Sequence, residues 1–416
     1  MKRFNYFAAM LTIMVLTTAC SNNDDYSEAF TPSKESESVT NTKTVLIYMS
    51  GRNDLSKDLE KDFYEIKEGS RRLGENDNLL VFVRLANSKE PWLARIKNGE
   101  VTDSVSLSDM GIESIDGQNR ASDPVVMEGV MHYAYNHYPA TGSNYGLVIE
   151  GHGTGWLMMN KVQPRRSRAF GTDWGEKCES KDACWININT IADILKNMPH
   201  LKFIMADCCN MMCLENLYEL RNACDYIIGS PAEIPDKGAP YDQIVPDLFA
   251  DGAFYTSIID KYYKSVGEKL PLTAVKTSEM QNVAQATRYA LQAVKTTIGD
   301  RYADMTGIIH YYHTDESKTF YPEYNIFYDA GDLIRNYAPA DIYQQWRQAL
   351  DKAIVECRIA TIWATDKMWY LKYSDFTVTE EKMHGVSMFV PQDPSLGNYA
   401  KYNEDIKLMA WYDAIS

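Results

Sequence analysis

Two short segments of this sequence carry residue types that could form a covalent catalyst. His152 lies in Glu150-Gly151-His152-Gly153, directly after the apolar run Tyr145–Ile149, and Cys209 follows the run His200–Ala206. In an open α/β sheet, functional sites form outside the carboxyl ends of the strands, and neighbouring strands lie about 4.8 Å apart. If the two runs are neighbouring parallel strands, an imidazole and a thiol reach a common site.

This pair has the chemistry of a thiol nucleophile with a general base. The thiolate is the reactive form of cysteine, and a nearby imidazolium favours it by lowering the cysteine pKa. The imidazole can then return a proton to a leaving amine. The glycines beside His152 let a substrate approach the backbone closely. The N–H groups of Gly153 and of Cys209, which we expect at the start of a helix, could stabilise a developing oxyanion.

Each segment by itself has a simpler interpretation. A lone His-Gly at a strand end is commonly a turn, and a Cys-Cys pair at a buried helix start commonly packs in the core or forms a disulfide. The two together are more specific, because they follow successive predicted strands and are separated by 57 residues (209 − 152). A histidine about 50 residues before the cysteine is the spacing noted for caspases.

The sequence resembles the clostripain family of bacterial cysteine peptidases from about residue 43 to the C-terminus. The family's histidine motif is similar to His152–Trp156, and its cysteine motif is similar to Asp207–Met211 followed by Glu215. Cys208 stands where the motif has alanine and Asn210 where it has leucine, so Cys209 is favoured as the nucleophile and Cys208 is the alternative. Further matches are Asn53-Asp54-Leu55, Ser230, Glu233, Pro235, Gly238, Tyr241, Tyr328–Leu333 and Gly385–Pro391.

The resemblance implies a caspase-like fold and an endopeptidase that cleaves after arginine or lysine. A cationic P1 side chain needs a carboxylate in its pocket, and Asp207, two residues before the nucleophile, is the first candidate. Its alternative role is to cap the helix expected at Cys209. Glu233 or Asp236, in the loop after the next strand, could hold the substrate instead.

The family also implies self-processing between the histidine and the cysteine. The basic loop 161–168 lies in this interval, and cleavage after Arg166 or Arg168 would match the specificity of the enzyme itself. The alternative is a solvated surface loop with no role in activation.

The elements around these segments alternate between strand and helix, which is typical of an α/β protein with a mostly parallel sheet flanked by helices. We expect a peptidase domain over residues 44–250 and a helix-rich C-terminal subdomain, 251–416, packed on the same sheet. Further strands are predicted at Thr44–Met49, Asn78–Leu85, Asp225–Ile228, Leu272–Val275 and Val386–Val390. Helices are predicted at Leu55–Arg72, Asp123–His137, Ile188–Asn197, Leu214–Ala223, Tyr255–Val266, Gln281–Thr297 and Ala340–Glu356.

The amino terminus predicts export. Residues 1–19 have a basic start and an apolar core too short to span a bilayer comfortably, as in a secretory signal peptide. Leu16–Cys20 resembles a bacterial lipobox, which would place a lipid on Cys20 at the outer membrane or cell surface; an ordinary signal peptide is the alternative. Residues 20–43 read as a polar, flexible tether. The net charge of −15 argues against a nucleic-acid partner.

Two other functions compete with the peptidase. Cys178, Cys184, Cys209 and Cys213 could bind zinc, but they lack the Cys-x2-Cys spacing of structural zinc sites, and Cys178 and Cys184 could instead form a disulfide. A non-catalytic surface lipoprotein could use the 28 tyrosines and 8 tryptophans to bind peptide or glycan. We predict no cofactor and no metal. Calcium is an alternative that no motif supports, because the sequence has no EF-hand-like loop.

Overall fold

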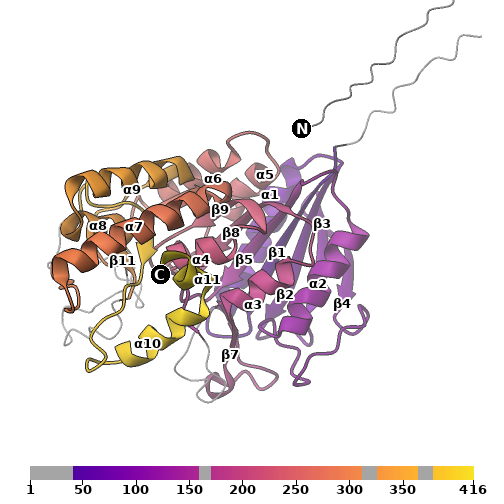
Figure 1. Cartoon of the computed structure of the whole chain (residues 1–416). Helices are drawn as coiled ribbons and strands as arrows, with labels where there is room; N and C mark the ends of the chain where they lie inside the picture. Colours follow the sequence, from indigo (N-terminus) through magenta and orange to yellow (C-terminus); the bar gives the residue numbers. More distant parts are fainter. Residues whose placement is uncertain (1–40, 159–169, 312–325, 364–377) are drawn as a thin grey trace, which may run out of the picture. The chain divides into compact units, whose positions relative to one another are not determined.

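Buried apolar runs form the centre of a nine-stranded sheet with the order β12-β10-β9-β8-β5-β1-β2-β3-β4 (Figure 1). The five central strands are parallel: β1 (Lys43–Gly51), β2 (Asp77–Leu85), β5 (Tyr145–Gly151), β8 (Leu201–Asp207) and β9 (Cys224–Gly229). The outer strands are antiparallel: β3 (Trp92–Lys97) and β4 (Glu100–Ser106) at one edge, and β10 (Leu272–Lys276) and β12 (Ile354–Arg358) at the other. The sheet is therefore mostly parallel at its centre, and the predicted fold class is confirmed.

The structure describes residues 41–158, 170–311, 326–363 and 378–416. The predicted signal peptide, Cys20 and most of the tether lie outside the described residues, as do the loop 161–168, Arg166 and Arg168. Residues Thr40–Ser416 form one compact unit, and residues 251–416 contribute β10 and β12 to the shared sheet. Within the described residues, none of the helices has the length and apolarity needed to cross a membrane.

Alternating side chains of the central strands enter two separate cores, because successive residues of a strand point to opposite faces. Val45, Ile47 and Met49 of β1 pack with α1 (Ser56–Gly69), α5 (Tyr241–Leu248) and α6 (Phe254–Ser265). Leu46 and Tyr48 face the opposite core. That core is covered by α2 (Pro124–His137), α3 (Ile188–Leu195), α4 (Leu214–Glu219), α7 (Met280–Ile298), α8 (Ala330–Tyr337), α9 (Ala340–Ala353), α10 (Tyr399–Asp405) and α11 (Ala410–Ile415).

Two small sheets lie outside the main one. β6 (Phe170–Asp173) pairs with β7 (Cys184–Ile186), and β11 (Tyr328–Asp329) pairs with β13 (Ser387–Met388). Short 3-10 helices occur at Ser70–Arg72, Ser180–Asp182, Thr277–Glu279 and Ile406–Leu408. The β6–β7 sheet matters for the site, because β6 contacts β1 and β5 and hydrogen-bonds to His152, just after β5.

The two strands expected to carry the catalyst are neighbours. β5 and β8 pair in parallel, with Glu150 opposite Asp207 in the register. The prediction that these strand ends meet is confirmed, and both ends face the same edge of the sheet. The residues that follow, His152 and Cys209, therefore leave the sheet side by side.

Three predicted elements differ from the structure. Cys209 is not at a helix start: it lies in a turn, and α4 begins at Leu214 and ends at Glu219 instead of Ala223. Asn210 has a φ of 60°, a left-handed conformation that ends any helix at once. The helix predicted over Ala340–Glu356 ends at Ala353, because the β-branched residues that follow pair with β10 as β12. The strand predicted over Val386–Val390 is reduced to Ser387–Met388.

Candidate active site

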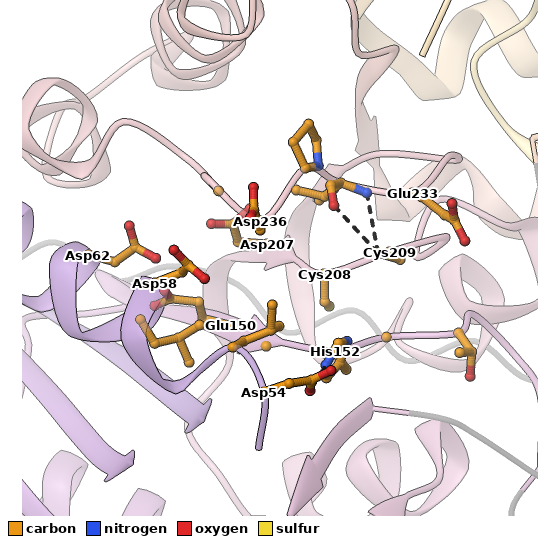
Figure 2. Close-up of a pocket in the computed structure, with 18 of the residues that line it drawn as sticks. Asp54, Asp58, Asp62, Glu150, His152, Asp207, Cys208, Cys209, Glu233 and Asp236 are labelled. Atoms are coloured by element: carbon orange, nitrogen blue, oxygen red, sulfur yellow. Dashed lines mark hydrogen bonds and ion pairs between the residues drawn. The ribbon is translucent and has the colours of Figure 1, made fainter. Parts of the chain in front are cut away.

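A pocket of about 340 Å³ opens at the carboxyl ends of β1, β5 and β8. His152 and Cys209 both line it, together with carboxyl side chains from several elements (Figure 2). Those carboxyl residues are Asp54, Asp58, Asp62, Glu150, Asp207, Glu233 and Asp236. The pocket thus combines a thiol, an imidazole and a cluster of carboxyl groups.

His152 is fixed by the backbone around it and by two side chains. The N–H of Gly171, in β6, donates to the His152 carbonyl at 2.8 Å. The imidazole Nε2 lies 2.8 Å from Oδ1 of Asp54, in the loop after β1, and the ring centroid lies 6.1 Å from that of Trp185, in β7. About 30% of the His152 side chain is exposed, so a substrate can reach it.

Cys209 presents its thiol in a turn rather than on a helix. Its Sγ accepts a hydrogen bond from the Ile234 N–H at 3.2 Å. Burial, and next the negative charge of Glu233, raise the pKa of the Cys209 thiol to about 12. In this arrangement the Cys209 thiol is protonated at neutral pH, so it would need a base to remove its proton before it could act as a nucleophile.

Cys208 has a different environment from Cys209. It is 1% exposed and belongs to the core under α2, α3 and α4, and burial raises the pKa of its thiol well above the ordinary value. Cys209 is partly exposed. A buried thiol packed among apolar side chains is a poor nucleophile.

Gly153 brings the His152 turn into direct contact with the Cys209 turn. A Cβ at this position would lie 2.9 Å from both the Cys208 Cβ and the Cys209 carbonyl oxygen, and 3.2 Å from the Cys209 nitrogen. Such approaches are too close for any side chain, so the position requires glycine. The backbones of Gly153 and Cys209, the two candidate oxyanion donors, consequently lie next to each other.

Asp207 ends β8 deep in the pocket. Its carboxylate accepts hydrogen bonds from the Ala239 N–H at 2.9 Å, the Tyr241 hydroxyl at 3.0 Å and the Tyr262 hydroxyl at 2.6 Å. Burial raises the pKa of Asp207, and these three donors oppose the shift. The alternative role as a helix cap is wrong, because no helix begins here and the oxygens bind residues of α5, α6 and the loop before α5.

Asp62 and Glu150 form a second acidic group that the sequence reasoning missed. Burial raises the pKa of both carboxyls, and each also faces the other and Asp207; the pKa of Asp62 is raised to about 8. Because two neighbouring buried carboxyls repel each other when both are ionised, the protonated form is favoured. A signal was present: Asp62 lies between Leu59 and Ile66 on the apolar face of α1, and Glu150 ends a buried strand.

Glu233 and Asp236, the other substrate-binding candidates, also line the pocket. In Figure 2 they are drawn on opposite sides of Cys209, with Asp236 on the side of Asp207 and Asp62. Glu233 is 8% exposed, and its negative charge raises the pKa of the Cys209 thiol. Asp236 is therefore the better placed of the two to join the Asp207 side of the pocket.

The zinc alternative has no support among the described residues, which contain no group of three or more His, Cys, Asp or Glu arranged to hold a metal ion. Cys178 and Cys184 are free thiols in the structure, as are Cys208, Cys209, Cys213, Cys224 and Cys357. The chemistry available in the pocket is that of a thiol, an imidazole and carboxyl groups, none of which requires a cofactor.

Similarity to known proteins agrees with this chemistry. The clostripain family model matches residues 47–416. A secreted C11 cysteine protease from Bacteroides thetaiotaomicron, solved with an irreversible peptide inhibitor, is 26% identical with a TM-score of 0.71, covering 90% of this chain and 99% of that one. An inactive zymogen C11 protease from Parabacteroides distasonis is 26% identical with a TM-score of 0.69, covering 90% and 97%.

No curated protein matches the sequence. The family match covers most of the chain and includes both site motifs, and the two solved proteases share the fold over nearly their whole length. These findings do not support the alternative of a non-catalytic binding lipoprotein. The chain belongs to the clostripain family of cysteine peptidases.

Proposed function

We propose that this peptidase cleaves peptide bonds after arginine or lysine, with Cys209 as nucleophile and His152 as general base and acid. The observation that carries the proposal is the lining of the pocket. Seven carboxyl residues share it with the thiol and the imidazole, and no lysine or arginine is among the described residues that line it. A desolvated acidic pocket selects a cationic side chain.

The chemical steps follow from the positions of the side chains. His152 takes the Sγ proton, and the thiolate attacks the carbonyl carbon of the scissile bond. The N–H groups of Gly153 and Cys209 stabilise the oxyanion. The imidazolium gives its proton to the leaving amine as the C–N bond breaks, leaving a thioester. Water, deprotonated by His152, then hydrolyses the thioester and releases the Cys209 thiolate, which regains a proton from the imidazolium.

The carboxyl groups of Asp62, Glu150 and Asp207 are suited to bind a cation, and the protein can also bury them when no substrate is bound. Asp207 already receives three hydrogen bonds, whereas burial raises the pKa of Asp62 and of Glu150, so this pair of carboxyls retains a proton at neutral pH. A guanidinium or ammonium group that enters the pocket replaces that proton as the partner of the carboxylates. Substrate binding is therefore linked to the release of a proton.

The specificity test compares peptides that differ only at P1, with arginine, lysine or the neutral isostere citrulline. We expect arginine to exceed citrulline about 10²- to 10³-fold in kcat/KM, because a buried carboxylate loses its partner with the neutral side chain. The ratio should rise between pH 6 and pH 9, since Asp62, whose pKa is about 8, becomes ionised in this range while arginine stays charged.

The ionisation of Cys209 and His152 affects both peptides equally and cancels in the ratio. Asp62→Asn should flatten the pH dependence of the ratio while turnover of the citrulline peptide stays the same. Equal turnover of the arginine, lysine and citrulline peptides would contradict the proposed specificity, although not the membership of the peptidase family.

Self-processing is the second part of the proposal. Cleavage after Arg166 or Arg168 suits the same specificity, and a structural neighbour is described as an inactive zymogen. The raised pKa of the Cys209 thiol is also in keeping with a resting form. Purified wild type should yield two fragments, separated by a cut within residues 161–168, whereas Cys209→Ala should stay intact. Fragments in both proteins would reject self-cleavage.

Export with a lipid on Cys20 is the proposed route to the cell surface. The lipobox-like Leu16–Cys20 supports it, and one structural neighbour is described as secreted. Mass spectrometry of the mature amino terminus tests the anchor, and an unmodified terminus would contradict it.

A further inference from the structure

The imidazole of His152 is held from the side of β1 as well as from its own strand. Its Nε2 lies 2.8 Å from Oδ1 of Asp54, which is a hydrogen-bond distance for an N–H and a carboxylate. Asp54 follows β1, the strand that pairs with β5, so its position is independent of the strand that carries Cys209. The Asp54 side chain is 65% exposed, so core packing does not force it against the imidazole.

The loop that presents Asp54 is rigid. Asn53, immediately before it, is 3% exposed, and its Oδ1 accepts a hydrogen bond from the Leu55 N–H at 2.9 Å. The Asn53 Nδ2 donates to the carbonyls of Ser50 at 3.0 Å and Thr172 at 2.7 Å. These bonds fix the backbone on both sides of Asp54, and the Thr172 contact joins the loop to β6.

Arg52 also fixes this loop, through hydrogen bonds to neighbouring segments. Arg52 is 7% exposed, and its guanidinium donates to the carbonyls of Gly175 at 2.7 Å and Ser88 at 3.0 Å. The Trp174 N–H returns a hydrogen bond to the Arg52 carbonyl at 3.0 Å. The β6–β7 sheet, which also packs Trp185 against His152, therefore holds the imidazole and its carboxylate partner in one frame.

We propose that Asp54 is a positioning residue for His152: its carboxylate binds Nε2 and leaves Nδ1 to exchange the proton of the Cys209 thiol. A carboxylate on one ring nitrogen fixes the tautomer and ring orientation and stabilises the imidazolium that forms during catalysis. This role rests on the proposed catalytic pair. It adds a third group to that pair, in the loop after β1.

Asp54 also lines the acidic pocket, so its carboxylate could act on the substrate cation instead. The two roles affect different kinetic constants. A group that binds P1 raises KM when it is removed and leaves kcat unchanged, whereas a group that orients the base lowers kcat. Asp58 provides a contrast, because it lines the same pocket from the first turn of α1 and its carboxylate contacts Lys61 at 2.7 Å rather than the imidazole.

The experiment measures kcat and KM of full-length Asp54→Ala, Asp54→Asn and Asp58→Asn on the arginine P1 peptide. Asp54→Ala should lower kcat about 10- to 100-fold with KM within about twofold, since a hydrogen bond to a charged group is lost. Asp54→Asn keeps an oxygen that accepts from Nε2–H, so it should recover part of kcat. Asp58→Asn should instead raise KM and leave kcat within about twofold.

Thermal melts of the two Asp54 variants should match that of wild type, because the Asp54 side chain is exposed; a melt of Asp58→Asn checks that this variant is folded. The positioning role is overturned if Asp54→Ala raises KM at unchanged kcat, or if Asp54→Asn recovers nothing. His152→Ala is measured in the same experiment. An active His152→Ala would contradict the proposed catalytic pair itself. An inactive His152→Ala together with a fully active Asp54→Ala would contradict only the positioning role.

Discussion

Replacing Cys209 with alanine should lower kcat/KM on an arginine P1 peptide by at least about 10³-fold, whereas Cys208→Ala should keep most of the activity. Loss of the covalent nucleophile leaves only binding and electrostatic stabilisation. Cys209 lines the pocket beside His152, and Cys208 packs 1% exposed in the core. Initial rates of the two variants and of wild type, at equal concentrations of folded protein and with substrate well below KM, make the comparison.

Cys208→Ala removes a buried sulfur and should cost about 1 kcal/mol of stability, which a thermal melt would register. Its activity should therefore be measured well below its melting temperature. If Cys208→Ala is inactive while folded, and Cys209→Ala still turns over peptide, the nucleophile is Cys208 and the assignment from the motif frame is incorrect.

Gly153→Ala should lower kcat about 10²- to 10³-fold. The new Cβ would lie 2.9 Å from the Cys208 Cβ and from the Cys209 carbonyl oxygen, so the Cys209 turn must shift. A shift of this turn moves both oxyanion donors and the thiol relative to the scissile carbonyl, and loss of a single oxyanion donor costs a factor of this size. Steady-state kinetics on the arginine peptide would measure the change.

Gly74→Ala is the matched control for the Gly153 substitution. Gly74 is exposed, and an added Cβ would meet only the flexible side chain of Asp77, at 3.2 Å. It should keep wild-type kcat and KM. Unchanged kcat in a folded Gly153→Ala would show that the backbone contact between the two turns has no part in catalysis.

The sequence was sufficient to predict the strands that deliver the catalyst. Runs such as Tyr145–Ile149 and His200–Ala206 are apolar on both faces, which only a central parallel strand requires. His152 and Cys209, which follow the two runs, were therefore expected at the carboxyl ends of these strands. Because β5 and β8 are hydrogen-bonded neighbours, the two motifs lie at one pocket, as the strand order expected from the sequence requires.

The local conformation of the nucleophile could not be predicted in the same way. A helix at Cys209 was the expectation, but the left-handed Asn210 makes a turn, and α4 starts only at Leu214. The hydrogen-bond donor to Sγ, the Ile234 N–H, comes from the loop after β9. Contacts of this kind depend on tertiary packing, which periodicity does not encode.

The edge strands were missed for a related reason. Residues Glu100–Ser106 of β4 are mostly exposed and polar, so they lack the alternation that marks a half-buried strand. β12 follows directly on α9, and its residues continue the helical pattern until the edge of β10 offers hydrogen-bond partners. The acidic group formed by Asp62, Glu150 and Asp207 likewise joins α1, β5 and β8 across long stretches of sequence.

Covalent labelling tests most directly whether the ends of β5 and β8 together form a thiol peptidase site. Wild-type protein is treated with an arginyl chloromethyl ketone, and the modified residue is mapped by mass spectrometry of its peptides. We expect one equivalent of label on Cys209, loss of peptidase activity in proportion, and much slower labelling of His152→Ala. Label on Cys208, or full activity in protein that carries the label on Cys209, would contradict it.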